Sequence, residues 1–237
     1  MNILEELKLK FRTGDVLTRL VLVNCGMFVL ILIADIFYTL FTSGTDMSIA
    51  RVFQFPWNPA VLLRHPWSIA TALFTSHGLW HLLFNMITLF WLGSIFLQFF
   101  TSNGLRGLYV LGGVAGMLCF MAVFLAFPSV NGKGWQQTIP LTSACILAFS
   151  TALAFRAPNH AEPIPLFGPV KIKYIVIVLA LADAALLPKS NPASDFAHLG
   201  AAATGWLYNF MLRKGHDITV PVTWLFVKTS NLVRSVK

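Results

Sequence analysis

Charged side chains are scarce in this sequence. Asp, Glu, Lys and Arg together make up 11% of the 237 residues, whereas apolar residues make up 57%. A typical soluble domain is about 25% charged and about 45–50% apolar. The shortage of charge excludes an ordinary soluble domain and is typical of a protein whose helices lie in a lipid bilayer.

Cysteine is also scarce, and its positions exclude two kinds of site. Cys25, Cys119 and Cys145 each lie inside a long apolar run, and their spacing is not that of zinc ligands. We interpret them as small buried side chains rather than as a disulfide framework or a metal site. We therefore expect no metal and no other cofactor.

Acidic residues are outnumbered by basic ones, 9 against 17, which gives a formal net charge of +8. An excess of this size can indicate a nucleic-acid-binding protein. Here the basic residues fall between apolar runs instead of clustering on one face, so we expect no nucleic-acid partner. The first apolar run is too long for a cleavable signal peptide, and no small-residue cleavage site follows it.

Long apolar runs are what the sequence does contain. A helix needs about 20 mostly apolar residues to cross a bilayer. Two of the runs are shorter and can span only if other helices surround them. We predict an all-α, polytopic bundle of six transmembrane helices over residues 18–212, with a cytoplasmic segment before it (1–17) and a cytoplasmic tail after it (213–237). The expected spans are residues 20–41, 79–100, 105–127, 141–156, 172–187 and 195–212.

Two connecting segments are expected at the membrane surface. Residues 42–78 are only half polar and contain Trp57 and Trp67, so we expect this segment to lie in the interface with its tryptophans at headgroup level. Residues 217–237 mix apolar and basic side chains and are expected to rest on the inner leaflet.

The distribution of basic residues gives the orientation. With six spans and the N-terminus inside, 13 of the 17 basic residues fall on the inner side and 4 on the outer side. This asymmetry agrees with the positive-inside rule, and a model with five spans would remove it. We therefore expect both termini in the cytoplasm. The outer residues are Arg51, Arg64, Lys133 and Lys189.

Four polar residues lie near the ends of spans that share one side. His81 and Asn85 are four residues apart near the start of the second span, so they share a helix face. Ser143 begins the fourth span, and His198 lies near the start of the sixth. Because the second, fourth and sixth spans all start on the outer side, these residues are expected at similar depth. Ionisable groups at such positions are candidates for function.

These residue types fit acyl transfer. A serine hydroxyl becomes a useful nucleophile when a base such as His198 accepts its proton. A tetrahedral oxyanion needs fixed donors, which the side chains of His81 and Asn85 and the backbone N–H of Ser143 can supply. The small residues Ala201 and Gly205 are expected to let the sixth helix approach the fourth closely.

The motifs around these residues resemble those of the rhomboid family of intramembrane serine proteases. His81-Leu-Leu-Phe-Asn85 is similar to the family's H-x-x-x-N, and Ala197-His198-Leu-Gly-Ala201 to the start of its A-H-x-x-G-x-x-x-G. Gly112-Gly113-Val-Ala-Gly116 resembles its glycine-rich third helix.

The resemblance implies a bacterial protease of the six-span type in the cell membrane. It implies that Ser143 is the nucleophile and His198 its partner, with His81 and Asn85 as oxyanion donors. It further implies that the partner is the transmembrane helix of another protein.

The resemblance is incomplete around the serine. The family's G-x-S-G reads Leu141-Thr-Ser143-Ala144 here, and the first glycine of the sixth-helix motif reads Ala201. Leu141 is expected to narrow the oxyanion site. An inactive rhomboid-like protein that binds transmembrane helices therefore remains an alternative.

Other interpretations stay open. His81 and Asn85 can form a polar bridge between helices, and Thr142 or Ser150 can be the reactive hydroxyl instead of Ser143. His77 and His81 have the spacing of zinc ligands, but Gly78 stands where a zinc protease has glutamate. A small transporter would carry interrupted helices or an internal repeat, and the sequence has neither.

The first prediction concerns topology. Reporter fusions at Lys237 and within residues 131–134 should report opposite sides of the membrane, because the basic residues place the tail inside and this loop outside. Two fusions on the same side would contradict the model with six spans.

Overall fold

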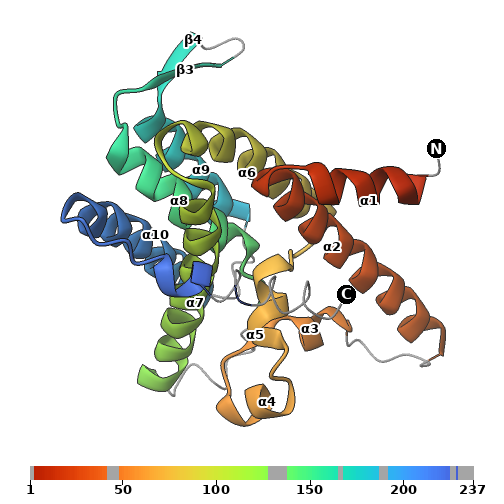
Figure 1. The fold of residues 1–237 in the computed structure, drawn as a ribbon. Helices are drawn as coiled ribbons and strands as arrows, with labels where there is room; N and C mark the ends of the chain where they lie inside the picture. Colours follow the sequence, from red (N-terminus) through yellow and green to blue (C-terminus); the bar gives the residue numbers. More distant parts are fainter. Residues whose placement is uncertain are drawn as a thin grey trace.

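The computed structural model describes residues 3–41, 48–127, 138–164, 168–186, 192–224 and 228. The chain is mostly helical in these ranges (Figure 1). The elements are α1 Ile3–Thr13, α2 Val16–Phe41, α3 Ala50–Phe53, β1 Phe55–Pro56, α4 Pro59–Arg64, α5 Ser68–Thr71, η1 Ala72–Phe74, α6 Leu79–Phe99, α7 Ser102–Ala126, β2 Thr138–Ile139, α8 Thr142–Arg156, β3 Ala161–Ile164, β4 Gly168–Lys171, α9 Ile172–Leu186 and α10 Pro192–Arg213.

Each of the six predicted runs coincides with one helix of at least 15 residues. The start of α2 lies earlier than expected because Asp15 caps it, accepting a hydrogen bond from the Thr18 backbone N–H (2.8 Å). This bond holds the pKa of Asp15 below its ordinary value. Among the described residues, α2, α6 and α7 are long and apolar enough to cross a membrane, while α8 and the apolar part of α9 are shorter.

The fold is mostly helical, as predicted, with two small antiparallel sheets in addition. Strand β1 pairs with β2, which ties the segment after α2 to the residues just before α8. Strands β3 and β4 form a hairpin between α8 and α9. In Figure 1 this hairpin projects from one end of the bundle, and α3, α4 and α5 lie at the opposite end.

The segments expected at the membrane surface contact the helical core. Trp57 stacks on Phe124 of α7, with ring centroids 5.1 Å apart. Ala72 and Leu73 are buried in the core. In the tail, Thr219 is buried against Gly107 of α7. Residues 42–47, 225–227 and 229–237 of these segments lie outside the described ranges.

The core is centred on α7, α8 and α10, with α6 and α2 packed beside them. Glycines permit the close contacts. A Cβ at Gly112 would collide with Ala148, and one at Gly205 would collide with the Ala148 carbonyl oxygen. Ala201 is fully buried in the same contact region. The predicted close approach of the sixth helix to the fourth is therefore confirmed.

A buried polar network fixes the first residue of α8. Asn24 of α2 is fully buried, and its Nδ2 donates to the Tyr109 hydroxyl of α7 (3.0 Å). Its Oδ1 lies 3.1 Å from Thr142 Oγ1. The Thr142 hydroxyl also lies 2.8 Å from the Thr75 carbonyl oxygen, and the Tyr109 hydroxyl donates to the Leu73 carbonyl oxygen (2.9 Å). The network joins α2, α7 and the segment after η1 to the start of α8.

The second prediction tests this network. Replacing Asn24 with Leu should lower the free energy of unfolding by about 1–2 kcal/mol, because buried hydroxyls lose a partner in an apolar interior. The measurement is the unfolding midpoint of the purified protein in detergent micelles.

Thr39→Val is the matched control for Asn24→Leu. The Thr39 hydroxyl is exposed and bonds to the Asp35 carbonyl oxygen of its own helix, so its loss should leave the midpoint almost unchanged. Equal midpoints for the two variants would show that the Asn24 network contributes no stability.

Candidate active site

Ser143 and His198 are in direct contact. Ser143 is the second residue of α8 and is 5% exposed, and His198 lies in the second turn of α10. The distance from Ser143 Oγ to His198 Nε2 is 2.9 Å. The two residues singled out in the sequence are thus within hydrogen-bond reach, 55 positions apart along the chain.

The other ring nitrogen of His198 determines which tautomer makes this contact. His198 Nδ1 lies 2.8 Å from the Ser194 carbonyl oxygen, one turn earlier in α10. A carbonyl oxygen only accepts, so Nδ1 carries the proton in the neutral ring. The lone pair of Nε2 then faces Ser143 Oγ, which is the arrangement of a general base waiting for a hydroxyl proton.

Ser194 is a site residue that the sequence interpretation missed. Its backbone oxygen, rather than its side chain, orients His198. Its position four residues before His198 on a helix could have indicated this contact, because residues at that spacing lie one above the other.

His81 and Asn85 form a second pair on α6. Asn85 Nδ2 lies 3.3 Å from His81 Nδ1, and both residues are buried. An amide nitrogen only donates, so Nδ1 of His81 accepts and Nε2 carries the proton. His81 therefore has an N–H donor on the side of its ring away from Asn85.

A small cavity connects Asn85 to the serine. It has a volume of about 30 Å³ and lies between α6, α8 and α9. Asn85 and Ser143 both line it. Asn85 of α6 and Ser143 of α8 therefore face a common space.

The start of α8 adds backbone donors. The Cys145 N–H is the first to bond back within this helix, to the Leu141 carbonyl oxygen (2.9 Å). The N–H groups of residues 142–144 therefore precede the helical ladder and lie at the positive end of the helix dipole. Such donors stabilise negative charge that develops next to Ser143 Oγ.

Two other hydroxyls considered from the sequence are engaged elsewhere. The Thr142 hydroxyl belongs to the network with Asn24. The Ser150 hydroxyl donates to the Ile146 carbonyl oxygen of its own helix (2.8 Å). Ser143 is the one of the three whose oxygen contacts a histidine ring.

Leu141 and His77 are two further residues that the sequence singled out. Leu141 is fully buried, and its Cδ2 lies 3.2 Å from the position that a Cβ on Gly116 would take, so its side chain packs toward α7. The rings of His77 and His81 make an edge contact, with centroids 5.3 Å apart. Within the described ranges, no third histidine, cysteine or acidic residue joins them in a metal-sized cluster.

Comparison with known proteins identifies the family. The family model described as the Rhomboid domain matches residues 63–215. Comparison with curated proteins and with solved structures finds no match. The matched range covers well over half of the 237 residues and includes Ser143, His198, His81 and Asn85. The chain is therefore a member of the rhomboid family.

Proposed function

We propose that this rhomboid protein is an intramembrane serine endopeptidase that cleaves the transmembrane helices of other membrane proteins. Ser143 is the nucleophile and His198 the general base and acid. The observation that carries the proposal is the 2.9 Å contact between Ser143 Oγ and His198 Nε2, with the opposite nitrogen held by the Ser194 carbonyl oxygen.

The reaction follows from the tautomer. His198 Nε2 takes the hydroxyl proton of Ser143 as Oγ attacks the carbonyl carbon of the scissile peptide bond. The tetrahedral intermediate collapses when the same nitrogen returns the proton to the leaving amine, which leaves an ester on Oγ. Water then attacks the ester as His198 Nε2 accepts its proton, and the same nitrogen returns a proton to Ser143 Oγ as the bond from Oγ to the acyl carbon breaks and the free acid leaves.

The oxyanion of the intermediate forms beside several donors. The Asn85 amide and the His81 Nε2–H come from α6, and the Ser143 backbone N–H comes from the start of α8. Asn85 shares the small cavity with Ser143, which supports its role as the nearer side-chain donor. In acyl-transfer catalysis, preorganised donors of this kind usually lower the activation barrier more than proton transfer does.

The membrane setting defines the substrate. We propose that all six long helices cross the bilayer, with both termini in the cytoplasm and the site near the outer side of a cell membrane. A substrate helix must unwind locally before cleavage, because its carbonyl groups are otherwise hydrogen-bonded and shielded. Segments with helix-destabilising residues are therefore the expected substrates.

A binding protein without peptidase activity is the second candidate. The sequence feature that favours it is Leu141, which stands where the family motif has a glycine, although its side chain packs toward α7. The two candidates differ in one property, the nucleophilicity of Ser143.

The third prediction concerns the dyad. Ser143→Ala and His198→Ala should each abolish cleavage of a reporter that carries a helix-destabilised transmembrane segment. The double variant should be no worse than either single variant, because the base has no task once the nucleophile is absent. The measurement is reporter cleavage in vesicles with equal amounts of folded protein.

Thr204→Ala is the matched control for the dyad. The Thr204 hydroxyl, on the same helix as His198, donates to the Gly200 carbonyl oxygen of that helix (2.9 Å), and its loss should leave cleavage intact. Persistent cleavage by Ser143→Ala would contradict the assignment of the nucleophile.

The fourth prediction concerns Asn85. Asn85→Ala should lower turnover by roughly two to three orders of magnitude, as the loss of one oxyanion donor does elsewhere. The folded protein should still accumulate, and kcat should fall more than KM rises, because the donor acts on the transition state.

Asn209→Ala separates this effect from simple loss of a buried amide. Asn209 is 4% exposed and also lies in a long helix, 11 residues beyond His198 in α10. Its replacement should leave turnover per folded molecule unchanged. If Asn85→Ala instead prevents accumulation of the protein, Asn85 is a structural bridge between helices.

A further inference from the structure

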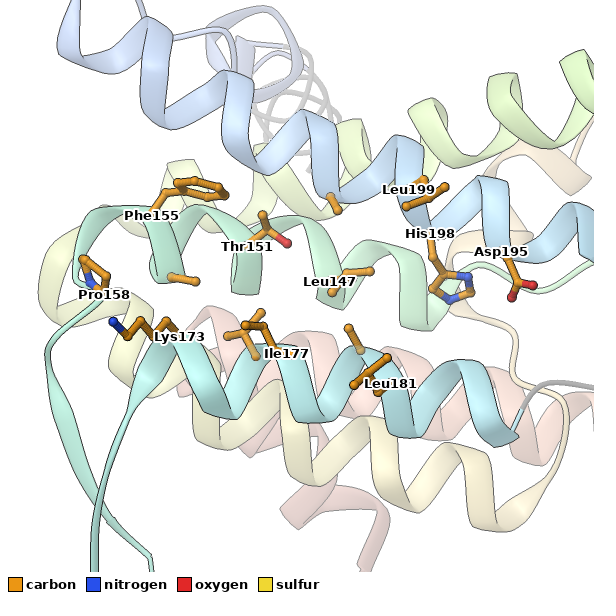
Figure 2. Close-up of a pocket in the computed structure, with 14 residues that line it drawn as sticks. Leu147, Thr151, Phe155, Pro158, Lys173, Ile177, Leu181, Asp195, His198 and Leu199 are labelled. Atoms are coloured by element: carbon orange, nitrogen blue, oxygen red, sulfur yellow. The ribbon is translucent and has the colours of Figure 1, made fainter.

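A groove separates α9 from α10, with α8 as its floor (Figure 2). Its volume is about 610 Å³, which is within the range of small-molecule sites, about 300–1,000 Å³. Most of its lining is apolar. The lining residues are Leu147, Thr151, Ala154, Phe155, Pro158, Lys173, Val176, Ile177, Ala180, Leu181, Asp195, His198, Leu199 and Ala202.

The two ends of the groove differ. Figure 2 shows His198 and Asp195 at one end, and Pro158 and Lys173 at the other. Residues 173 and 181 lie on α9 at either side of the apolar stretch, and a helix rises about 12 Å over eight residues. The apolar groove therefore extends from His198 at one end to a basic end at the other.

Several cations gather at the basic end. Lys173 lines the groove itself and is half-buried. Arg213 Nη2 donates to the carbonyl oxygen of Phe155, a lining residue (3.3 Å). Arg156 ends α8 and Lys171 ends β4, and both are exposed.

An acid also lies near the basic end. Glu162 of β3 contacts His160 Nε2 (2.9 Å). The described residues at this end therefore carry a net positive charge, which suits an anionic group.

The chemistry of the groove selects its occupant. An extended peptide would need partners for its backbone N–H and C=O groups. The apolar stretch between the two ends offers one polar side chain, Thr151. A hydrocarbon chain needs no such partners.

We propose that this groove binds one anionic phospholipid of the bilayer. An acyl chain lies along the apolar stretch between α9 and α10, and its end reaches the side of His198 that faces the groove. The phosphate lies at the basic end, where Lys173 and Arg213 attract it. The acyl chain thereby excludes water from the side of the Ser143–His198 pair that faces the groove. The binding itself does not depend on the proposed peptidase activity.

Native mass spectrometry of the purified full chain tests this binding. The protein in detergent is titrated in parallel with dioleoylphosphatidylglycerol and dioleoylphosphatidylcholine, which have the same chains and differ in net charge. The wild type should retain one phosphatidylglycerol in preference to phosphatidylcholine. Lys173→Gln should weaken phosphatidylglycerol retention by roughly five-fold, the effect of one cation near the membrane surface, and leave phosphatidylcholine unchanged.

Two further variants separate charge from space. Arg106→Gln removes a cation at the start of α7, outside the groove lining, and should leave retention unchanged. Ala202→Trp fills the apolar stretch and should lower retention of both lipids. Circular dichroism confirms that each variant is folded.

Three outcomes would overturn the proposal. The first is equal retention of the two lipids by the wild type, or equal effects of Lys173→Gln and Arg106→Gln. The second is unchanged lipid retention in Ala202→Trp together with reduced reporter cleavage, which would make a substrate segment the occupant. The third is a change from dimer to monomer in Ala202→Trp at constant lipid retention, which would make a second copy the occupant.

Discussion

The buried polar side chains at the start of α8 need partners within the protein. Thr142 meets this requirement with Asn24 and with the Thr75 carbonyl oxygen. The backbone N–H of Leu141 donates to the Ala72 carbonyl oxygen (2.8 Å). These bonds fix the residues on the N-terminal side of Ser143. The position of the serine is therefore a consequence of how buried polar groups are satisfied.

The same constraint explains a dyad that uses a backbone carbonyl in place of a carboxylate. A buried anion beside His198 would carry a large desolvation cost, whereas the Ser194 carbonyl oxygen orients the ring at little cost. Small residues then set the distance, because Gly205 and Ala201 let α10 lie against α8. The geometry of the Ser143–His198 contact and the packing of the helices thus depend on the same few residues.

The sequence predicts the helices and the four polar side chains because both follow from strong, local signals. Long apolar runs indicate helices, and the alternation of spans places Ser143 and His198 on one side. The β3–β4 hairpin is not predictable in this way, since its strands have four residues each and both contain proline. The sequence gives one indication of the Asn24 network, which is an amide side chain within an apolar run. The role of the Ser194 carbonyl depends on backbone geometry, which residue types do not reveal.

The central claim is that His198 makes Ser143 nucleophilic. Its most direct test is labelling of the membrane-embedded protein with a fluorophosphonate probe, followed by mass spectrometry of the modified peptide. Our account predicts one adduct, on Ser143 Oγ, in the wild type and a loss of labelling in His198→Ala. An adduct on another hydroxyl, equal labelling of His198→Ala, or a wild type that does not react would contradict it.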